Sequence, residues 1–173
     1  SSTAELVFEN VIVQEENMLG ELGKGFYIAM NTLNMGRIGI GAQALGIAQA
    51  SVDKSIDYMK QREAFGKKIA EFQGLQFTLS EIVTQLEAAR FLVYDAAMRA
   101  DNNLPLIKEA SMAKYYSSKV AMDASRFAVQ VHGGYGFIED FDVERYYRDA
   151  KITEIYEGTS EIQKLVIARE LLK

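Results

Sequence analysis

The sequence predicts an all-α fold, an up-and-down four-helix bundle, with a short β segment in front of it. Hydrophobic residues make up 49% of the 173 residues, which suffices for one domain with a real core. The only proline is Pro105, so nearly the whole chain is free to form long helices. From about residue 25 onward, apolar residues recur at steps of three and four, the period of an amphipathic helix. Long amphipathic helices joined by short loops are expected to pack as a bundle.

Residues 4–13 are the exception to this helical pattern. They contain the stretch ELVFENVIV, whose β-branched and aromatic residues alternate in part with polar ones, and this predicts a strand or a strand pair. A lone pair of strands is only marginally stable. We therefore expect residues 1–22 to be the remnant of a sheet domain and residues 23–173 to form the helical domain.

The helical domain is expected to contain three long helices and a final shorter one. Their predicted ranges, with a short piece before the last, are 25–62, 73–101, 105–132, 142–149 and 160 to the C-terminus. Residues 61–73 break the periodicity and are predicted as a loop. Ser160 and Gln163 fit a capping box at the start of the last helix. Glycines at 36, 39, 41 and 46 indicate that another helix or a ligand approaches the first helix closely.

Composition excludes several classes of function. The formal charge of −5 is spread without a basic stripe, which argues against nucleic-acid binding. No apolar run approaches the roughly 20 residues of a membrane span, and no signal-peptide pattern opens the chain. The chain has no cysteine and a single histidine, His132, so no thiolate chemistry and no metal site is expected. Catalysis would depend on carboxylates, hydroxyls, arginines or a bound cofactor.

Three short motifs are candidates for chemistry, each with a plainer alternative. In IYEGTSEIQ, residues 155–163, Glu157 precedes a glycine where the chain enters a helix, so its carboxylate could face a cleft or be a solvated loop charge. The string HGGYG, residues 132–136, could approach a phosphate or be a simple glycine turn, and it lacks the dinucleotide fingerprint. Arg62 suits a pyrophosphate, although an arginine in a loop is more often a solvated surface charge.

Taken together, five separated motifs resemble one family. They are NMGRIGIGAQALGIAQ (34–49), QREAFGKKIAEFQ (61–73), AVQVHGGYGF (128–137), RDAKITEIYEGTSEIQ (148–163) and the tail KLVIARELL. In order and spacing these motifs resemble the C-terminal part of the acyl-CoA dehydrogenases, closest to the short-chain, butyryl-CoA members. The resemblance covers nearly the whole chain and extends to residues 1–22, which resemble the end of the family's middle β-domain.

The resemblance implies a flavoenzyme. Members carry an N-terminal helical domain and a β-domain before a C-terminal four-helix bundle, use FAD, and pass electrons to an electron-transferring flavoprotein. It also implies a homodimer or homotetramer, because FAD spans a subunit boundary in these enzymes. The expected location is the cytoplasm of a bacterium or the mitochondrial matrix. The 173 residues alone are expected to bind FAD weakly and to turn over no substrate.

The resemblance also implies the chemistry. Glu157 matches the glutamate that removes the α-proton of the acyl thioester while the β-hydrogen leaves as hydride to the flavin. Isovaleryl-type relatives carry this base on the first long helix, at the position of Gly36, and glycine cannot abstract a proton, so that assignment is disfavoured. An acyl-CoA oxidase, or a non-catalytic helical oligomerisation module, are the alternatives.

Cofactor and substrate contacts follow by resemblance as well. The matching FAD contacts are Arg62, Phe65, Gln73, Gln130, Gly133, Gly134, Thr159 and Glu161, with Gln130 and the two glycines contributed to a neighbouring subunit. Arg37 matches an arginine near the CoA moiety, and Tyr156 and Gly158 match residues that line the acyl thioester site. Asn34 stands where close relatives often have an aspartate near CoA, and His132 replaces an apolar residue.

Overall fold

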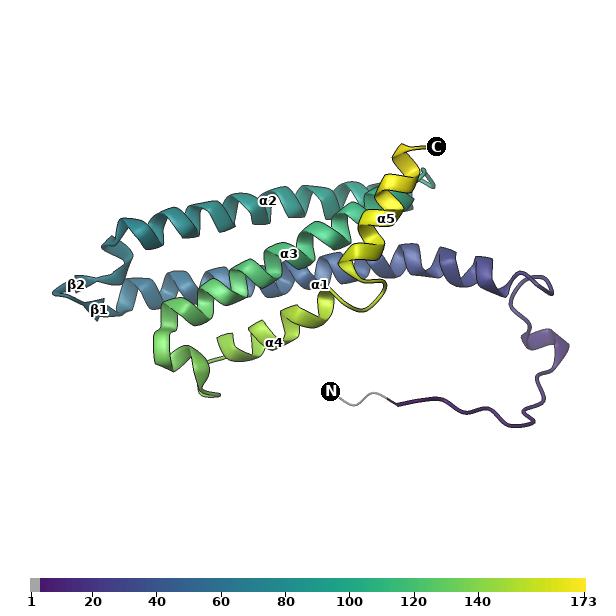
Figure 1. Ribbon diagram of the computed structural model, residues 1–173, viewed down its shortest axis with the longest axis horizontal. Coiled ribbons are helices and arrows are strands. Elements are labelled where there is room, and N and C mark those ends of the chain that lie inside the picture. The colour runs from purple at the N-terminus through teal and green to yellow at the C-terminus, as the bar shows by residue number, and fades with distance from the viewer. Residues whose placement is uncertain (1–3) are drawn as a thin grey trace. The chain divides into compact units, whose positions relative to one another are not determined.

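The computed structural model describes residues 4–173, and the chain divides into two compact units, Ser1–Thr32 and Leu33–Lys173. Figure 1 shows the elements in order. Helix α1 (Gly25–Gln61) begins in the first unit and supplies most of its length to the second. The second unit contains every residue that the sequence singles out for chemistry.

The first unit corrects one prediction. Residues 4–14 form no strand, and from residue 4 to the start of α1 the regular structure is one 3₁₀ turn, Glu15–Asn17. The alternation of side chains is local, but a strand also requires a neighbour that accepts its backbone hydrogen bonds. No such neighbour exists among the described residues. Six apolar side chains of the segment are 61–86% exposed: Leu6, Val7, Phe8, Val11, Ile12 and Val13. That this segment belongs to a sheet domain, with a boundary after residue 22, stays a prediction.

The second unit confirms the predicted helical bundle. After α1 come four helices: α2 (Gln73–Asp101), α3 (Ile107–His132), α4 (Val143–Thr153) and α5 (Ser160–Leu171). Helices α2 and α3 pack on each other, and α4 and α5 both pack on α3. The turn before α3 contains Pro105, which lacks an N–H and restricts the residue before it. The predicted helix boundaries lie close to those observed.

The segment predicted as a loop between the first two long helices is a small hairpin. Strands β1 (Glu63–Ala64) and β2 (Lys67–Lys68) pair antiparallel, and a 3₁₀ turn, Ile69–Glu71, leads into α2. The two residues between the strands, Phe65 and Gly66, have φ of +54° and +80°. Such left-handed pairs match the twist of a two-residue hairpin turn. The strands are too short for alternation to show in the sequence.

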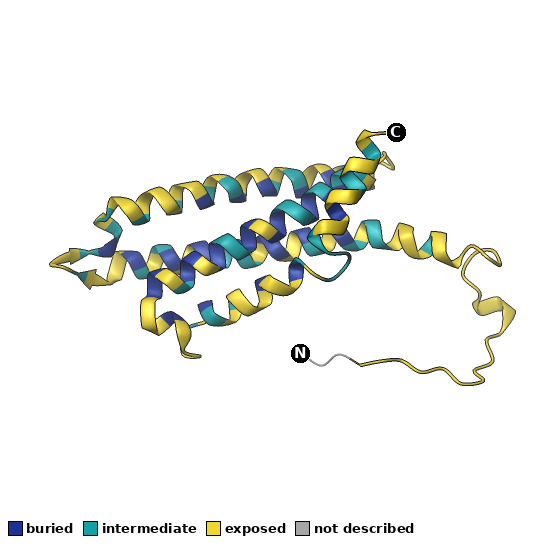
Figure 2. Ribbon diagram, viewed as in Figure 1, coloured by how far each residue is buried: buried dark blue, intermediate teal, exposed yellow. Residues whose placement is uncertain are grey.

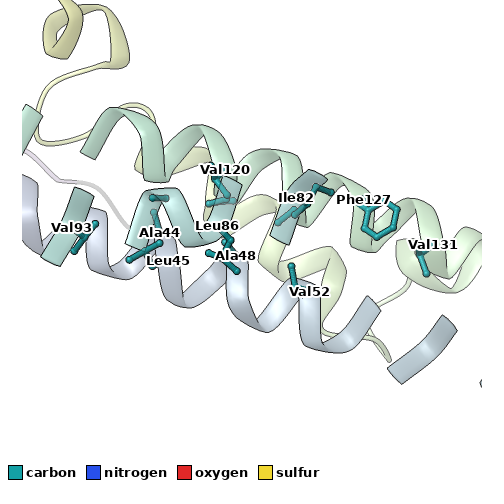
Figure 3. Close-up of a cluster of buried hydrophobic side chains, with 14 of the residues drawn as sticks. Ala44, Leu45, Ala48, Val52, Ile82, Leu86, Val93, Val120, Phe127 and Val131 are labelled. Atoms are coloured by element: carbon teal, nitrogen blue, oxygen red, sulfur yellow. The ribbon is translucent and has the colours of Figure 1, made fainter. Parts of the chain in front are cut away.

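The core lies between the three long helices, as the dark-blue faces in Figure 2 show. Figure 3 shows its centre, where Ala44 and Ala48 of α1 are fully buried beside Leu86 of α2 and Val120 of α3. Gly41 explains part of this close approach, because a Cβ at that position would lie 3.1 Å from Cγ2 of Val93. The small residues of α1 therefore let α2 and α3 pack directly against its backbone.

No helix within residues 4–173 combines the length and apolar character that crossing a bilayer needs. Across the same described residues, no three side chains of histidine, cysteine, aspartate or glutamate come together in a way that could hold a metal ion.

Replacing Leu86 by alanine should destabilise the bundle by about 2–5 kcal/mol, the usual result of leaving a cavity in a packed core. Leu86 is 2% exposed, whereas Leu165 of α5 is 58% exposed, so Leu165→Ala is a matched control with a much smaller expected effect. Urea unfolding of the two variants measures the difference. Equal losses in both would contradict the placement of the core.

Candidate active site

Glu157 lies in a tight turn between α4 and α5. Its φ is +54° and that of the following Gly158 is +90°, so two successive residues adopt left-handed conformations. Glycine tolerates this region, but a glutamate adopts it only at some cost in free energy, usually where the surroundings enforce it. The turn reverses the chain and directs the Glu157 side chain toward α1.

Side chains from three helices hold this turn. Lys114 Nζ of α3 donates a 2.8 Å hydrogen bond to the Gly158 carbonyl. Gln163 Nε2 of α5 donates to the same carbonyl at 2.9 Å and to the Glu157 carbonyl at 3.1 Å. On the α1 side, the Tyr156 hydroxyl donates to Oε1 of Gln43 at 2.6 Å. The backbone that carries Glu157 is therefore fixed to α1, α3 and α5.

The start of α5 differs from the predicted capping box. Thr159, rather than Ser160, is the N-cap, and its Oγ1 accepts a hydrogen bond from the Ile162 N–H at 3.4 Å. Gln163 does not reach back to the helix N-terminal N–H groups, because its amide is used by the carbonyls of the preceding turn. The same residues that suggested a cap thus serve the Glu157 turn.

The Glu157 carboxylate lies directly over Gly36 of α1. A Cβ placed on Gly36 would come within 2.5 Å of Glu157 Oε2, so any other residue there would require the carboxylate to shift. Oε2 itself is buried and has no hydrogen-bond partner. A buried polar atom without a partner is costly, and such atoms are concentrated where a ligand or a reaction uses them. The close approach predicted at this glycine is therefore an approach by the carboxylate.

Arg37 follows Gly36 and is 7% exposed, with Nη1 donating to Asn34 Oδ1 at 2.8 Å and Nε unpaired. Burial lowers the pKa of Arg37, while the nearby charge of Glu157 raises it. Arg37 thus places a fixed positive charge near the carboxylate, on the same side of α1.

Lys114 is a buried charged residue beside this turn that sequence reasoning missed. It is fully buried, and burial lowers its pKa to about 8, an effect that the charge of Glu154 opposes. The helical spacing could have indicated that Lys114 is buried, because it follows Ala110 by four residues and precedes Ser117 by three, and all three lie on the buried face of α3. A lysine on an apolar stripe is unusual unless it is paired.

The residues matched to FAD contacts fall into separate groups. Arg62, Gly133 and Gly134 line one cavity of about 450 Å³, together with His132 and Tyr58. Gln130 lines a second cavity of about 450 Å³ between α2 and α3. Thr159 and Glu161 line a third, of about 290 Å³, at the start of α5. Phe65, 96% exposed at the hairpin tip, and Gln73, at the start of α2, line neither of the first two.

The first of these cavities has an aromatic wall. The His132 ring stacks on Tyr58 with centroids 4.1 Å apart, and its Nδ1 donates to the Ala128 carbonyl at 2.8 Å. Because a carbonyl only accepts, that bond fixes the proton on Nδ1 of the neutral ring. Burial lowers the pKa of His132, so the neutral form dominates at pH 7. Exposed Arg62 supplies the cavity's positive charge.

The first of these cavities is far from Glu157 along α1, whereas the third is beside it at the start of α5. Arg62 follows Arg37 by 25 residues, and a helix rises about 1.5 Å per residue, so about 38 Å of helix separates the two side chains. One chain therefore carries a buried carboxylate site near the middle of the bundle and an exposed basic and glycine-rich site at its hairpin end.

Comparison with known proteins identifies the family. A family model described as "Acyl-CoA dehydrogenase, C-terminal domain" matches residues 23–172. The chain belongs to the acyl-CoA dehydrogenases. Within this family it is 54% identical, over 100% of its length, to the rat protein named "Short-chain specific acyl-CoA dehydrogenase, mitochondrial". It is 49% identical, over 99% of its length, to the Acetobacterium woodii protein named "Caffeyl-CoA reductase-Etf complex subunit CarC".

A solved structure supports the same assignment. Butyryl-CoA dehydrogenase from Megasphaera elsdenii superposes with a TM-score of 0.95 at 51% identity, covering 96% of this chain and 44% of that one. The chain spans 42% of the rat protein and 45% of the A. woodii protein. It thus corresponds to the C-terminal domain of an acyl-CoA dehydrogenase, less than half the length of these relatives.

Acidification should destabilise the fold through His132. The unfolded imidazole has a pKa of about 6.5, and burial lowers the pKa in the folded state. As the pH falls through about 6.5, the imidazole of the unfolded state is protonated while that of the folded state stays neutral. The free energy of unfolding therefore decreases as the pH decreases. His132→Phe keeps a stacking ring that cannot be protonated and should lose part of this decrease between pH 7 and 5.

Urea unfolding at several pH values measures this effect. Tyr58→Phe is the matched control, because it retains the stack and His132 and should keep the pH dependence of the unchanged protein. An identical pH dependence in the His132→Phe variant would show that His132 does not contribute.

Proposed function

We propose that this domain supplies the catalytic base of an FAD-dependent acyl-CoA dehydrogenase that converts a short-chain acyl-CoA to the trans-2-enoyl-CoA. The observation that carries the proposal is the Glu157 carboxylate, held by a tethered turn over Gly36 with Oε2 buried and unpaired. A structural carboxylate would be expected to find a hydrogen-bond partner. A base that must accept a proton from carbon needs a free lone pair.

In the proposed reaction Glu157 takes the α-proton of the thioester and the β-hydrogen leaves as hydride, so a carbon–carbon double bond forms. When bound, FAD supplies the hydride acceptor. Gly36 keeps side-chain bulk away from the carboxylate, while Gly158 leaves space for the Gln163 amide that holds the turn. The Tyr156 ring, tethered to Gln43, would border the acyl chain. Arg37, buried beside Glu157, would contact the CoA side of the substrate and keep a positive charge near the developing enolate.

The described residues fit FAD as the cofactor. A pyrophosphate suits an exposed guanidinium and glycine backbone, which Arg62, Gly133 and Gly134 supply in one cavity. At the start of α5, Thr159 and Glu161 border a polar cavity. Hydrogen bonds from its own N–H and from the Thr159 hydroxyl lower the pKa of Glu161, so its carboxylate occupies part of that helix terminus. Phe65, Gln73 and Gln130 are exposed and free to contact the adenosine part.

A homodimer or homotetramer explains the separation of the two sites. About 38 Å of helix lies between Arg37 and Arg62. We propose that a second copy supplies the hairpin end, with Arg62, to the cofactor that lies beside Glu157. Exposed apolar side chains on α2 provide a surface for such contact: Phe77, Phe91, Tyr94 and Met98, each 56–73% exposed.

The substrate and the electron acceptor are proposed from the relatives. The names of the rat and M. elsdenii proteins favour a short acyl chain such as butyryl-CoA, a substrate of fatty-acid β-oxidation. The A. woodii name favours an electron-transferring flavoprotein as the redox partner, as opposed to the oxygen used by an oxidase. The buried, unpaired Oε2 of Glu157 favours catalysis over a purely structural module. The cellular location and the inactivity of the isolated 173 residues stay predictions.

Glu157→Gln should abolish proton abstraction while preserving the shape of the site. The expected result is a loss in kcat of about 10²–10⁴-fold, the usual contribution of a general base, with FAD content unchanged. Steady-state kinetics of the complete enzyme with butyryl-CoA measure it. Glu139→Gln, on an exposed loop, is the control and should be indistinguishable from the unchanged enzyme. Retention of kcat in the Glu157 variant would refute the assigned base.

Gly36→Ala should separate stability from activity. Alanine favours helix formation over glycine by about 1 kcal/mol, but its Cβ would displace the Glu157 carboxylate. Turnover should therefore fall at least about tenfold without loss of stability. Gly46→Ala on the same helix, where a Cβ meets nothing within 4 Å, should gain stability and keep turnover. Full activity in the Gly36 variant, by butyryl-CoA assay beside urea unfolding, would contradict the geometry.

A further inference from the structure

The turn that carries Glu157 is supported by two buried donors from different helices. Lys114 Nζ at 2.8 Å and Gln163 Nε2 at 2.9 Å both donate to the Gly158 carbonyl. A carbonyl oxygen has two lone pairs, so these two bonds fill its capacity. Gln163 also donates to the Glu157 carbonyl. The two peptide groups on the C-terminal side of the Glu157 Cα are thus each fixed by a side chain.

Both donors are in places where an apolar residue would ordinarily stand. Lys114 and Gln163 are each 0% exposed, and they are among the largest fully buried side chains of the protein. Burying an ammonium group is costly unless it is paired, and methionine would fill a similar volume without that cost. The hydrogen bond to Gly158 connects residues 44 positions apart and is the one that the Lys114 ammonium makes. Packing alone does not account for a lysine here.

The charges around Lys114 are those of the site itself. Glu157, Glu154 and Glu161 raise the pKa of Lys114, and Arg37 lowers it, although burial has the largest effect. A neutral amine could still donate to Gly158, so the hydrogen bond does not depend on the charge. Lys114 therefore acts first through its position on α3 and its contact with the turn.

The contact between Lys114 and the turn affects the position of the Glu157 carboxylate, because there is little space between that carboxylate and Gly36. Rotation of the Glu157–Gly158 peptide would change the direction of the Glu157 side chain, and the carboxylate sits where even a Cβ on Gly36 would collide with it. The left-handed φ of Glu157 adds a tendency to relax toward a common conformation. Without its donors the turn would be free to move the base away from its place over α1.

We propose that Lys114 is a positioning residue for the reaction: together with Gln163 it clamps the Glu157–Gly158 turn so that the carboxylate meets the substrate's α-carbon. This inference rests on the proposed function, in which Glu157 is the base. A displacement of about 1 Å at a reacting group is enough to lower a rate by about 10²-fold. Loss of the clamp should therefore affect proton abstraction and leave substrate and cofactor binding largely intact.

The test is Lys114→Met in the complete enzyme, with Lys119→Met as the matched control. Lys119 lies on the same helix but its ammonium contacts Asp123. For Lys114→Met we expect kcat per bound FAD to fall about 10- to 100-fold, with KM for butyryl-CoA changed less than about threefold. The isotope effect on kcat with α-deuterated substrate should increase, because proton abstraction becomes more rate-limiting. Lys119→Met should match the unchanged enzyme in all three measurements.

The outcomes separate this inference from the function it rests on. If the unchanged enzyme fails to dehydrogenate acyl-CoA, the proposed function is wrong. If it is active and Lys114→Met keeps kcat per FAD and the isotope effect, showing only a lower Tm, Lys114 is merely structural. Gln163→Met removes the other donor from α5 and must give the same kinetic pattern. Should Lys114→Met not fold, wild-type kcat in the Gln163 variant would overturn the clamp.

Discussion

The left-handed turn at Glu157 and Gly158 is the constraint on which the site depends. It is not a stable local conformation for a glutamate, so its geometry has to be imposed from outside. The side chains that hold the turn in this geometry come from α3 and α5, and the turn faces α1. The core between α1, α2 and α3 therefore has a direct bearing on chemistry, because the alanines that bring these helices together also set the distance between Gly36 and the turn.

The sequence predicts those features that depend on local rules and misses those that depend on partners. Helix α2 was predicted at its observed bounds because its apolar period is regular and Pro105 stands close behind it. The strand predicted at residues 4–13 is wrong because a ladder needs a neighbour that no local pattern reveals. Glu157 was found through a family resemblance. The hydrogen bond from Lys114 that supports the Glu157 turn was not predicted, because it joins residues 44 positions apart.

The long first helix separates two kinds of surface that one cofactor would need. In its N-terminal half, Gly36 and Arg37 lie beside a buried carboxylate, while beyond its C-terminal end Arg62 shares a cavity with Gly133 and Gly134. A rigid helix cannot bring these together within one copy. In the proposed homodimer or homotetramer, each copy would complete its neighbour's site. The length of α1 would thus be a requirement of shared sites as well as of packing.

The pairing of Gly36 with Glu157 also explains how a base could move between elements during divergence within such a fold. The two positions are far apart in sequence but meet at one point, where a Cβ on residue 36 would come within 2.5 Å of the Glu157 carboxylate. A carboxylate extending from α1 into that space would exclude one from the turn, both by volume and by repulsion between like charges. A relative with its base on the helix would therefore require a small or uncharged residue at the turn. In this chain Gly36 gives the carboxylate on the turn its space, so α1 would contribute clearance rather than a base.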